Sequence, residues 1–86
     1  MIQRVSVPVS VQLAFDHKKR KVWPQTVVWE GIVYPIHEIG LHHRYTKGKT
    51  LYHIFSVASD GIFFKLSLNT DNLFWELEEI SDGLPE

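Results

Sequence analysis

A two-residue hydrophobic period in residues 62–77 is the feature that most restricts the fold of this chain. Apolar residues occupy every second position from Ile62 to Leu68, which is the pattern of a strand with one buried face. Four turn-forming residues follow at positions 69–72, and the alternation then resumes from Leu73. We therefore predict a β-hairpin here, at the centre of the core.

The same alternation recurs in the N-terminal half. Every odd-numbered residue from Val5 to Phe15 is apolar, and a strand of that length must bend or break within a small domain. Pro8 has no N–H to donate, so it indicates a sheet edge or a bulge. Further strands are predicted at 26–29 and 32–36 around a tight turn at Glu30-Gly31, and at 51–57 before a turn at Asp60-Gly61.

No segment keeps a helical hydrophobic period over three turns. We therefore predict an all-β fold, a small bent antiparallel sheet of five or six strands approaching a barrel or roll. Residues 1–80 would form a single β-domain and residues 81–86 a polar C-terminal tail. The predicted core consists of Val7, Val9, Val11, Leu13, Val28, Tyr34, Ile36, Phe55, Val57, Phe64, Leu66, Leu68, Trp75 and Leu77.

The length of 86 residues suits one domain, and the chain has no cysteine. It therefore has neither disulfides nor thiolate ligands, which fits a reducing compartment. No apolar run approaches the roughly 18 residues of a membrane span, and the first residues lack the pattern of a signal peptide. We expect a cytoplasmic protein that does not enter the membrane.

Two core motifs resemble a known class of proteins. Residues 28–36, VWEGIVYPI, follow the pattern V-W-x-G-x-x-Y-x-[VI], and residues 64–70, FKLSLNT, precede Trp75-Glu76-Leu77. Over roughly residues 27–77 the chain resembles a class of short bacterial β-domains of unknown function, some of them encoded near translesion DNA polymerase genes. The resemblance implies the fold and a nucleic-acid context, and no activity. The pair His42-His43 and the basic first loop are additions that we do not associate with that class.

Charge is segregated along the chain. Residues 1–53 carry a formal charge of +5 and residues 54–86 a charge of −6. Such asymmetry is found where a polyanion-binding face lies beside an acidic region. It is also found where both sets of charges are solvated, or where the halves attract each other within the fold.

The histidines are the first candidates for chemistry. Three converging imidazoles can hold zinc, and His37, His42, His43 and His53 lie near one another in the sequence. Neighbours on a strand point to opposite faces, so His42 and His43 would diverge, although either could lie opposite His53. We therefore predict no metal site and no cofactor.

Enzymatic signatures are missing from the sequence. There is no cysteine nucleophile, no G-x-S-x-G elbow and no glycine-rich phosphate loop. We predict that the protein is not an enzyme, and a metal-dependent enzyme using the histidines is the third alternative.

Two basic loops flanked by aromatic residues are the candidate binding residues. Cations beside aromatic rings on a small β-domain are what single-strand nucleic-acid binding uses. The hypothetical nucleic-acid site consists of Lys18, Lys19, Arg20, Lys21, Trp23, Arg44, Tyr45, Lys47 and Lys49.

The first functional hypothesis is nevertheless a protein-interaction module or small subunit. Its partner would be an unidentified protein or a second copy of the chain, bound through an open strand edge or an exposed aromatic patch. One contiguous basic face carrying Trp23 or Tyr45 would favour nucleic acid, which is the alternative. Scattered charges beside a bare strand edge would favour a protein partner.

Overall fold

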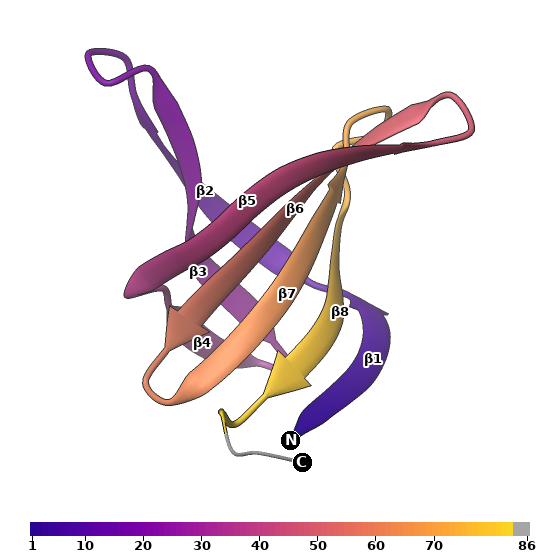
Figure 1. The fold of residues 1–86 in the computed structure, drawn as a ribbon. Helices are drawn as coiled ribbons and strands as arrows, with labels where there is room; N and C mark the ends of the chain where they lie inside the picture. The colour runs from indigo at the N-terminus through magenta and orange to yellow at the C-terminus, as the bar shows by residue number, and fades with distance from the viewer. Residues whose placement is uncertain (84–86) are drawn as a thin grey trace.

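The computed structural model describes residues 1–83, and its fold is all-β, as predicted (Figure 1). The described residues contain no helix long and apolar enough to span a membrane. The strands are β1 (Ile2–Pro8), β2 (Ser10–Asp16), β3 (Lys21–Trp29), β4 (Ile32–Pro35), β5 (Glu38–Lys47), β6 (Thr50–Ser59), β7 (Ile62–Asn69) and β8 (Trp75–Ser81).

Two antiparallel sheets pack on each other. The larger has the order β1-β8-β7-β6-β5, and the smaller has the order β2-β3-β4. The predicted hairpin of residues 62–77 is confirmed as β7 and β8, which lie inside the larger sheet. Its second strand begins at Trp75, two residues later than the alternation indicates, because Leu73 adopts the left-handed φ of 63° in the turn.

The long N-terminal run breaks, as its length requires. β1 pairs with β8 in the larger sheet and β2 pairs with β3 in the smaller one, so the chain changes sheets between Pro8 and Ser10. A bulge between Arg4 and Val7, with Ser6 at a φ of 47°, bends β1 before the break.

The predicted sheet of five or six strands approaching a barrel is wrong in detail. Eight strands form two sheets that do not close, because the short β4 ends at Pro35 and the chain crosses directly to the larger sheet. There the Ile36 N–H donates to the Gln25 carbonyl and the His37 N–H to the Ala58 carbonyl, each at 2.9 Å. Beyond these two bonds, β3 and β5 diverge (Figure 1).

The core lies between the two sheets. The predicted residues Phe55, Val57, Phe64, Leu66 and Leu77 are buried there, against a partly buried rim that includes the predicted Val7, Val9, Val11, Tyr34, Ile36 and Trp75. Leu68 is half-buried. The sequence prediction did not include Val27 and Ile54, which are both buried.

Two core predictions are wrong. Val28 is only half-buried, because its neighbour Val27, paired with Val11, is the residue that faces the larger sheet. Leu13 is 46% exposed, because the hairpin of β2 and β3 extends beyond the sheet that would cover it.

The predicted tight turns are confirmed. Glu30-Gly31 and Asp60-Gly61 both have positive φ at each central residue, which matches the twist of the flanking strands. Ser81, which we expected in the tail, is the last residue of β8 and pairs with Ile2 and Phe63. The rest of the tail from residue 84 onward lies outside the described residues.

Candidate binding groove between β3 and β5

A groove opens where the two sheets fail to close. β4 pairs with β3 only over residues 26–29. The segment Lys21–Pro24 therefore pairs with β2 on one side and, among residues 1–83, has no strand on the other. β5 is one of the two edge strands of the larger sheet. The groove that these two edges border has a volume of about 700 Å³, within the range of roughly 300–1,000 Å³ that is typical of ligand pockets.

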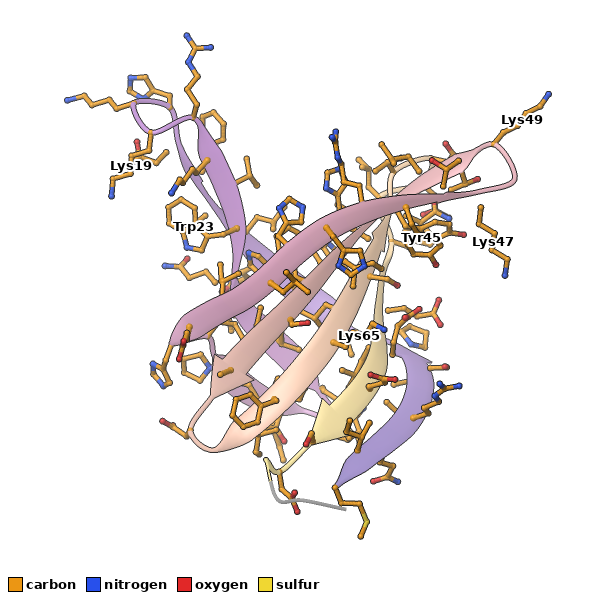
Figure 2. All side chains as sticks on the ribbon, viewed as in Figure 1. Lys19, Trp23, Tyr45, Lys47, Lys49 and Lys65 are labelled. Carbon is orange, nitrogen blue, oxygen red and sulfur yellow. The ribbon has the colours of Figure 1, made fainter. Side chains whose placement is uncertain are left out.

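The groove has a basic wall and a mixed wall. The β2–β3 hairpin contributes Lys19, Arg20, Lys21, Val22 and Trp23, and Figure 2 shows Lys19 and Trp23 on this projecting arm. The opposite wall is the start of β5 with the segment before it, and Phe55 lies at the bottom. This second set consists of Ile36, His37, Glu38, Ile39, His42 and Phe55.

Aromatic rings form a row from the groove into the core. His42 pairs with Phe55 in the register of β5 and β6, and their rings stack face to face with centroids 4.1 Å apart and planes 6° apart. Phe55 in turn contacts Trp75 at 5.7 Å. His42 is exposed and Phe55 is buried, so the row runs from the surface of the groove into the core and gives the groove an aromatic floor.

His42 and His53 form a hydrogen-bonded pair beside this row. The distance from His42 Nε2 to His53 Nδ1 is 2.8 Å, so one ring nitrogen donates and the other accepts. With ring centroids 5.1 Å apart, these near-parallel rings meet at their edges rather than face to face. Burial lowers the pKa of His42, and the neighbouring His53, Arg44 and His43 lower it further.

The histidines do not assemble a metal centre in the part of the chain that the structure describes. No group of three His, Asp or Glu side chains in residues 1–83 is arranged to hold an ion. His42 and His43 pair with consecutive β6 residues, Phe55 and Ile54 respectively, and therefore point to opposite faces of the sheet.

The predicted basic residues divide between two arms. Lys19, Arg20, Lys21 and Trp23 line the groove, and Lys18 lies in the same hairpin turn. Arg44 is close enough to His42 to influence its pKa. Lys47 and Lys49 instead lie at the tip of the β5–β6 hairpin, far along a diverging arm (Figure 2).

Tyr45 lies away from the groove. It stacks on Tyr52, its partner in register, with ring centroids 5.1 Å apart. Burial raises the pKa of Tyr45, and the carboxylates of Glu78 and Glu76 also raise it. Its surroundings are therefore acidic, which is the opposite of what a nucleic-acid stacking platform needs.

Seven groove residues were not in the predicted site, namely Val22, Ile36, His37, Glu38, Ile39, His42 and Phe55. No strand was predicted for the segment that holds Glu38 and Ile39, and Phe55 was predicted only as a core residue. His42 was examined only as a metal ligand. The sequence offered one way to identify His42 as a groove residue. If residues 41–45 pair with residues 51–55, His42 lies beside Phe55.

A second hollow of about 260 Å³ lies between residues of β5, β6, β7 and β8, including Gly40, Ser56, Phe63 and Ile80. It is smaller than the groove and mostly apolar, and its charged lining residues within the described part of the chain are Glu38, Lys65 and Glu79. Ligand sites combine apolar walls with convergent polar groups, so the groove between β3 and β5 is the better candidate.

Comparisons with protein-family models, with curated proteins and with solved structures found no match to this chain. The resemblance to short bacterial β-domains therefore stays a prediction.

Proposed function

We propose that this protein is a non-catalytic protein-interaction module that binds an extended peptide as an added strand between β3 and β5. The observation that carries the proposal is the pair of unpaired strand edges on the two sides of one groove. An edge strand presents unpaired N–H and C=O groups, and proteins recognise extended peptides by pairing with them.

β5 is suited to this role. It is ten residues long and every one of its residues is exposed. In an edge strand, alternate residues direct their backbone groups away from the existing partner, here β6. An added strand would pair with these groups, bury its inward side chains against Trp23, Ile39 and the His42–Phe55 stack, and close the gap that keeps the sheets from forming a barrel.

The lining of the groove supports binding rather than catalysis. Its described residues include no hydroxyl or thiol side chain, so it offers no nucleophile of the kind that a neighbouring base activates. The ring of His42 is stacked on Phe55 and hydrogen-bonded to His53. Both contacts hold the imidazole as part of the floor.

Single-stranded nucleic acid is the second candidate. The observation in its favour is that three consecutive cations and Trp23 line one groove, which is the combination that binds phosphates and stacks bases. It ranks second because Lys47 and Lys49 are on the other arm and Tyr45 is beside carboxylates. The charges are divided, and a bare strand edge lies beside them.

The test of the proposed function uses short capped peptides of alternating valine and threonine. We expect weak, saturable binding that is followed by tryptophan fluorescence, because Trp23 lines the groove. Two N-methylated peptides then test the mode of binding, each methylated on one of the two alternate sets of amides. A strand that pairs with β5 alone uses one set of amides, whereas a strand that also pairs with β3 uses both. At least one methylated peptide should therefore lose binding, and both should lose it if the strand bridges the two edges. Undiminished binding of both methylated peptides would contradict strand addition.

A matched pair of substitutions tests the location. Ile39 lines the groove and pairs with Val57, whereas Leu41 pairs with Ser56 and is not part of the lining. Removing three carbons that a ligand buries costs about 2 kcal/mol, so Ile39→Ala should weaken peptide binding roughly tenfold or more. Leu41→Ala should leave it unchanged, although Leu41 is the more exposed residue (57% against 37%).

A further inference from the structure

We infer that the strand accepted by the groove is acidic, with carboxylates spaced to meet the basic wall and apolar side chains between them. This inference rests on the proposed function and names the chemistry of its partner. The relevant features are the charges along the groove, the backbone conformation of Arg20 and the aromatic floor.

The charges of the groove are strongly unbalanced. Lys19, Arg20 and Lys21 line it against a single carboxylate, that of Glu38, and two histidines, His37 and His42. His37 is itself 3.1 Å from the Asp60 carboxylate. A neutral or basic strand would leave the three cations of the basic wall without opposite charges beside them, whereas an acidic strand would neutralise them.

The turn that carries the cations is ordered by its own hydrogen bonds. The backbone N–H groups of Lys18 and Lys19 both donate to Asp16 Oδ1, at 3.0 and 3.2 Å. Asp16 thus holds the turn at the start of the basic wall. The wall is presented on a fixed backbone, so less entropy is lost when a ligand binds.

Arg20 occupies a backbone position at which glycine would be less strained. Its φ is 54°, in the left-handed region that costs a side-chain-bearing residue energy. The corresponding hairpin tip between β5 and β6 uses Gly48 at a φ of 62°. A charged residue held in a strained conformation at a groove is a feature associated with binding sites.

The aromatic floor of the groove is the reason to expect apolar residues between the carboxylates of the ligand. In an added strand, alternate side chains point toward the core, where they meet Phe55, Ile36 and Trp23. The intervening residues point outward, toward the rim where the exposed cations lie. An extended sequence that alternates apolar and acidic residues satisfies both sides of the groove at once.

The protein's own β8 has this pattern, with Trp75 and Leu77 separated by Glu76. β8 cannot serve as the ligand from a second folded copy, because it is already paired on both edges, with β1 and with β7. We therefore infer from the charge of the basic wall that the occupant is an acidic extended segment of another protein.

The experiment compares three capped peptides of equal length, in which valine alternates with glutamate, with glutamine or with lysine. An exposed charge pair contributes modestly, so we expect the glutamate peptide to bind about tenfold more tightly than the glutamine peptide at low salt. The lysine peptide should bind most weakly. The preference for glutamate should shrink toward parity at about 1 M salt, where the screening length is roughly 3 Å.

Paired variants locate the charge effect. Replacing Lys19 and Lys21 by Gln should remove most of the preference for glutamate. Replacing Lys47 and Lys49 by Gln removes the same charge from the other arm and should preserve it. Exposed loop charges contribute little to stability, so both double variants should fold, which a thermal melt checks.

Each outcome decides between the proposals. Equal binding of the glutamate and glutamine peptides would overturn the acidic specificity and leave the peptide-binding module intact. Failure of all three peptides, with binding of a thymidine oligonucleotide that the Lys19/Lys21 variant abolishes, would overturn both proposals in favour of nucleic acid. Preference for glutamate that survives the Lys19/Lys21 variant would place the acidic site elsewhere and contradict the inference.

Discussion

The two hairpin arms of this protein both have basic tips, but their surroundings differ. The β2–β3 arm and the β5–β6 arm both project from the packed sheets and both end in lysines (Figure 1, Figure 2). The first borders an open strand edge, an aromatic floor and a groove of about 700 Å³. The second carries Tyr45 beside the acidic residues of β8. Both arms include an unpaired strand edge, but the groove and its aromatic floor lie beside the basic loop of the first arm alone. Similar basic loops thus have different binding potential.

The largest expected effect is on the free energy of unfolding, and it concerns the core from which both arms project. Leu66 and Leu13 are both apolar residues of strands with an alternating hydrophobic pattern. Leu66 is completely buried in the core, whereas Leu13 is exposed on the part of its arm that the other sheet does not cover. Leu66→Ala should lower the free energy of unfolding by about 2–5 kcal/mol, and Leu13→Ala by less than about 0.5 kcal/mol. Denaturant unfolding measures both. Equal losses would mean that the β2–β3 arm packs as core and that the groove does not exist.

The next prediction compares the contributions of the two arms to peptide binding. Trp23→Ala removes an aromatic wall of the groove and should weaken binding of the valine–glutamate peptide at least tenfold, because aromatic residues dominate such contacts. Tyr45→Ala removes an aromatic residue from the other arm and should leave the affinity unchanged. Isothermal titration calorimetry avoids any dependence on tryptophan fluorescence. A larger loss for Tyr45→Ala would reverse the comparison.

A smaller effect on stability is expected at the turns of the two hairpin arms. Arg20→Gly relieves a left-handed residue that has a side chain, although glycine raises the entropy of the unfolded chain, so stability should rise by only about 0.5 kcal/mol. Gly48→Ala places a side chain at a φ of 62° with no clash within 4 Å, and should cost about 1 kcal/mol for the backbone conformation alone. Arg20→Gly should also weaken binding of the valine–glutamate peptide. A gain in both stability and affinity would remove the functional explanation for Arg20.

The smallest expected effect concerns the protonation of His42, at the floor of the groove. The pKa of His42 lies below its ordinary value of 6.5, so the unfolded chain takes up this proton at a higher pH than the folded protein does. The contribution of His42 therefore makes the free energy of unfolding fall as the pH drops through 6.5, levelling off below the lowered pKa.

Two variants separate the causes of this shift. His53→Gln should raise the pKa of His42 toward 6.5, and His43→Gln should raise it less, since His43 is the weaker influence. NMR titration of the His42 ring protons measures both. No change with His53→Gln would contradict the hydrogen-bonded pair.

Much of the fold was predictable from alternation and turn chemistry. The hairpin of β7 and β8 and the turns at Glu30-Gly31 and Asp60-Gly61 depend on local sequence, and local physics determines them. Val27 was missed in favour of Val28 because Gln25 is an extra residue in β3 opposite β2. A bulge of this kind shifts the alternation by one position, and hydrophobic patterns do not reveal it.

The candidate site was only half predictable. Clustered lysines beside Trp23 are visible in the sequence, so one wall of the groove was identified. The other wall depends on where β3 and β5 diverge, which follows from the early end of β4 at Pro35 and the crossing at Ile36 and His37. This tertiary geometry separates two basic loops that look equivalent in the sequence.

Amide hydrogen exchange, with and without saturating valine–glutamate peptide, tests most directly whether the open edge of β5 receives a strand. We predict slower exchange at the alternate amides of β5 that point away from β6, above all within residues 38–42, which border the groove. The outer edge of β1, at the other side of the same sheet, should show no change. Protection on β1 rather than β5, or peptide binding with no protection on either edge, would contradict the account.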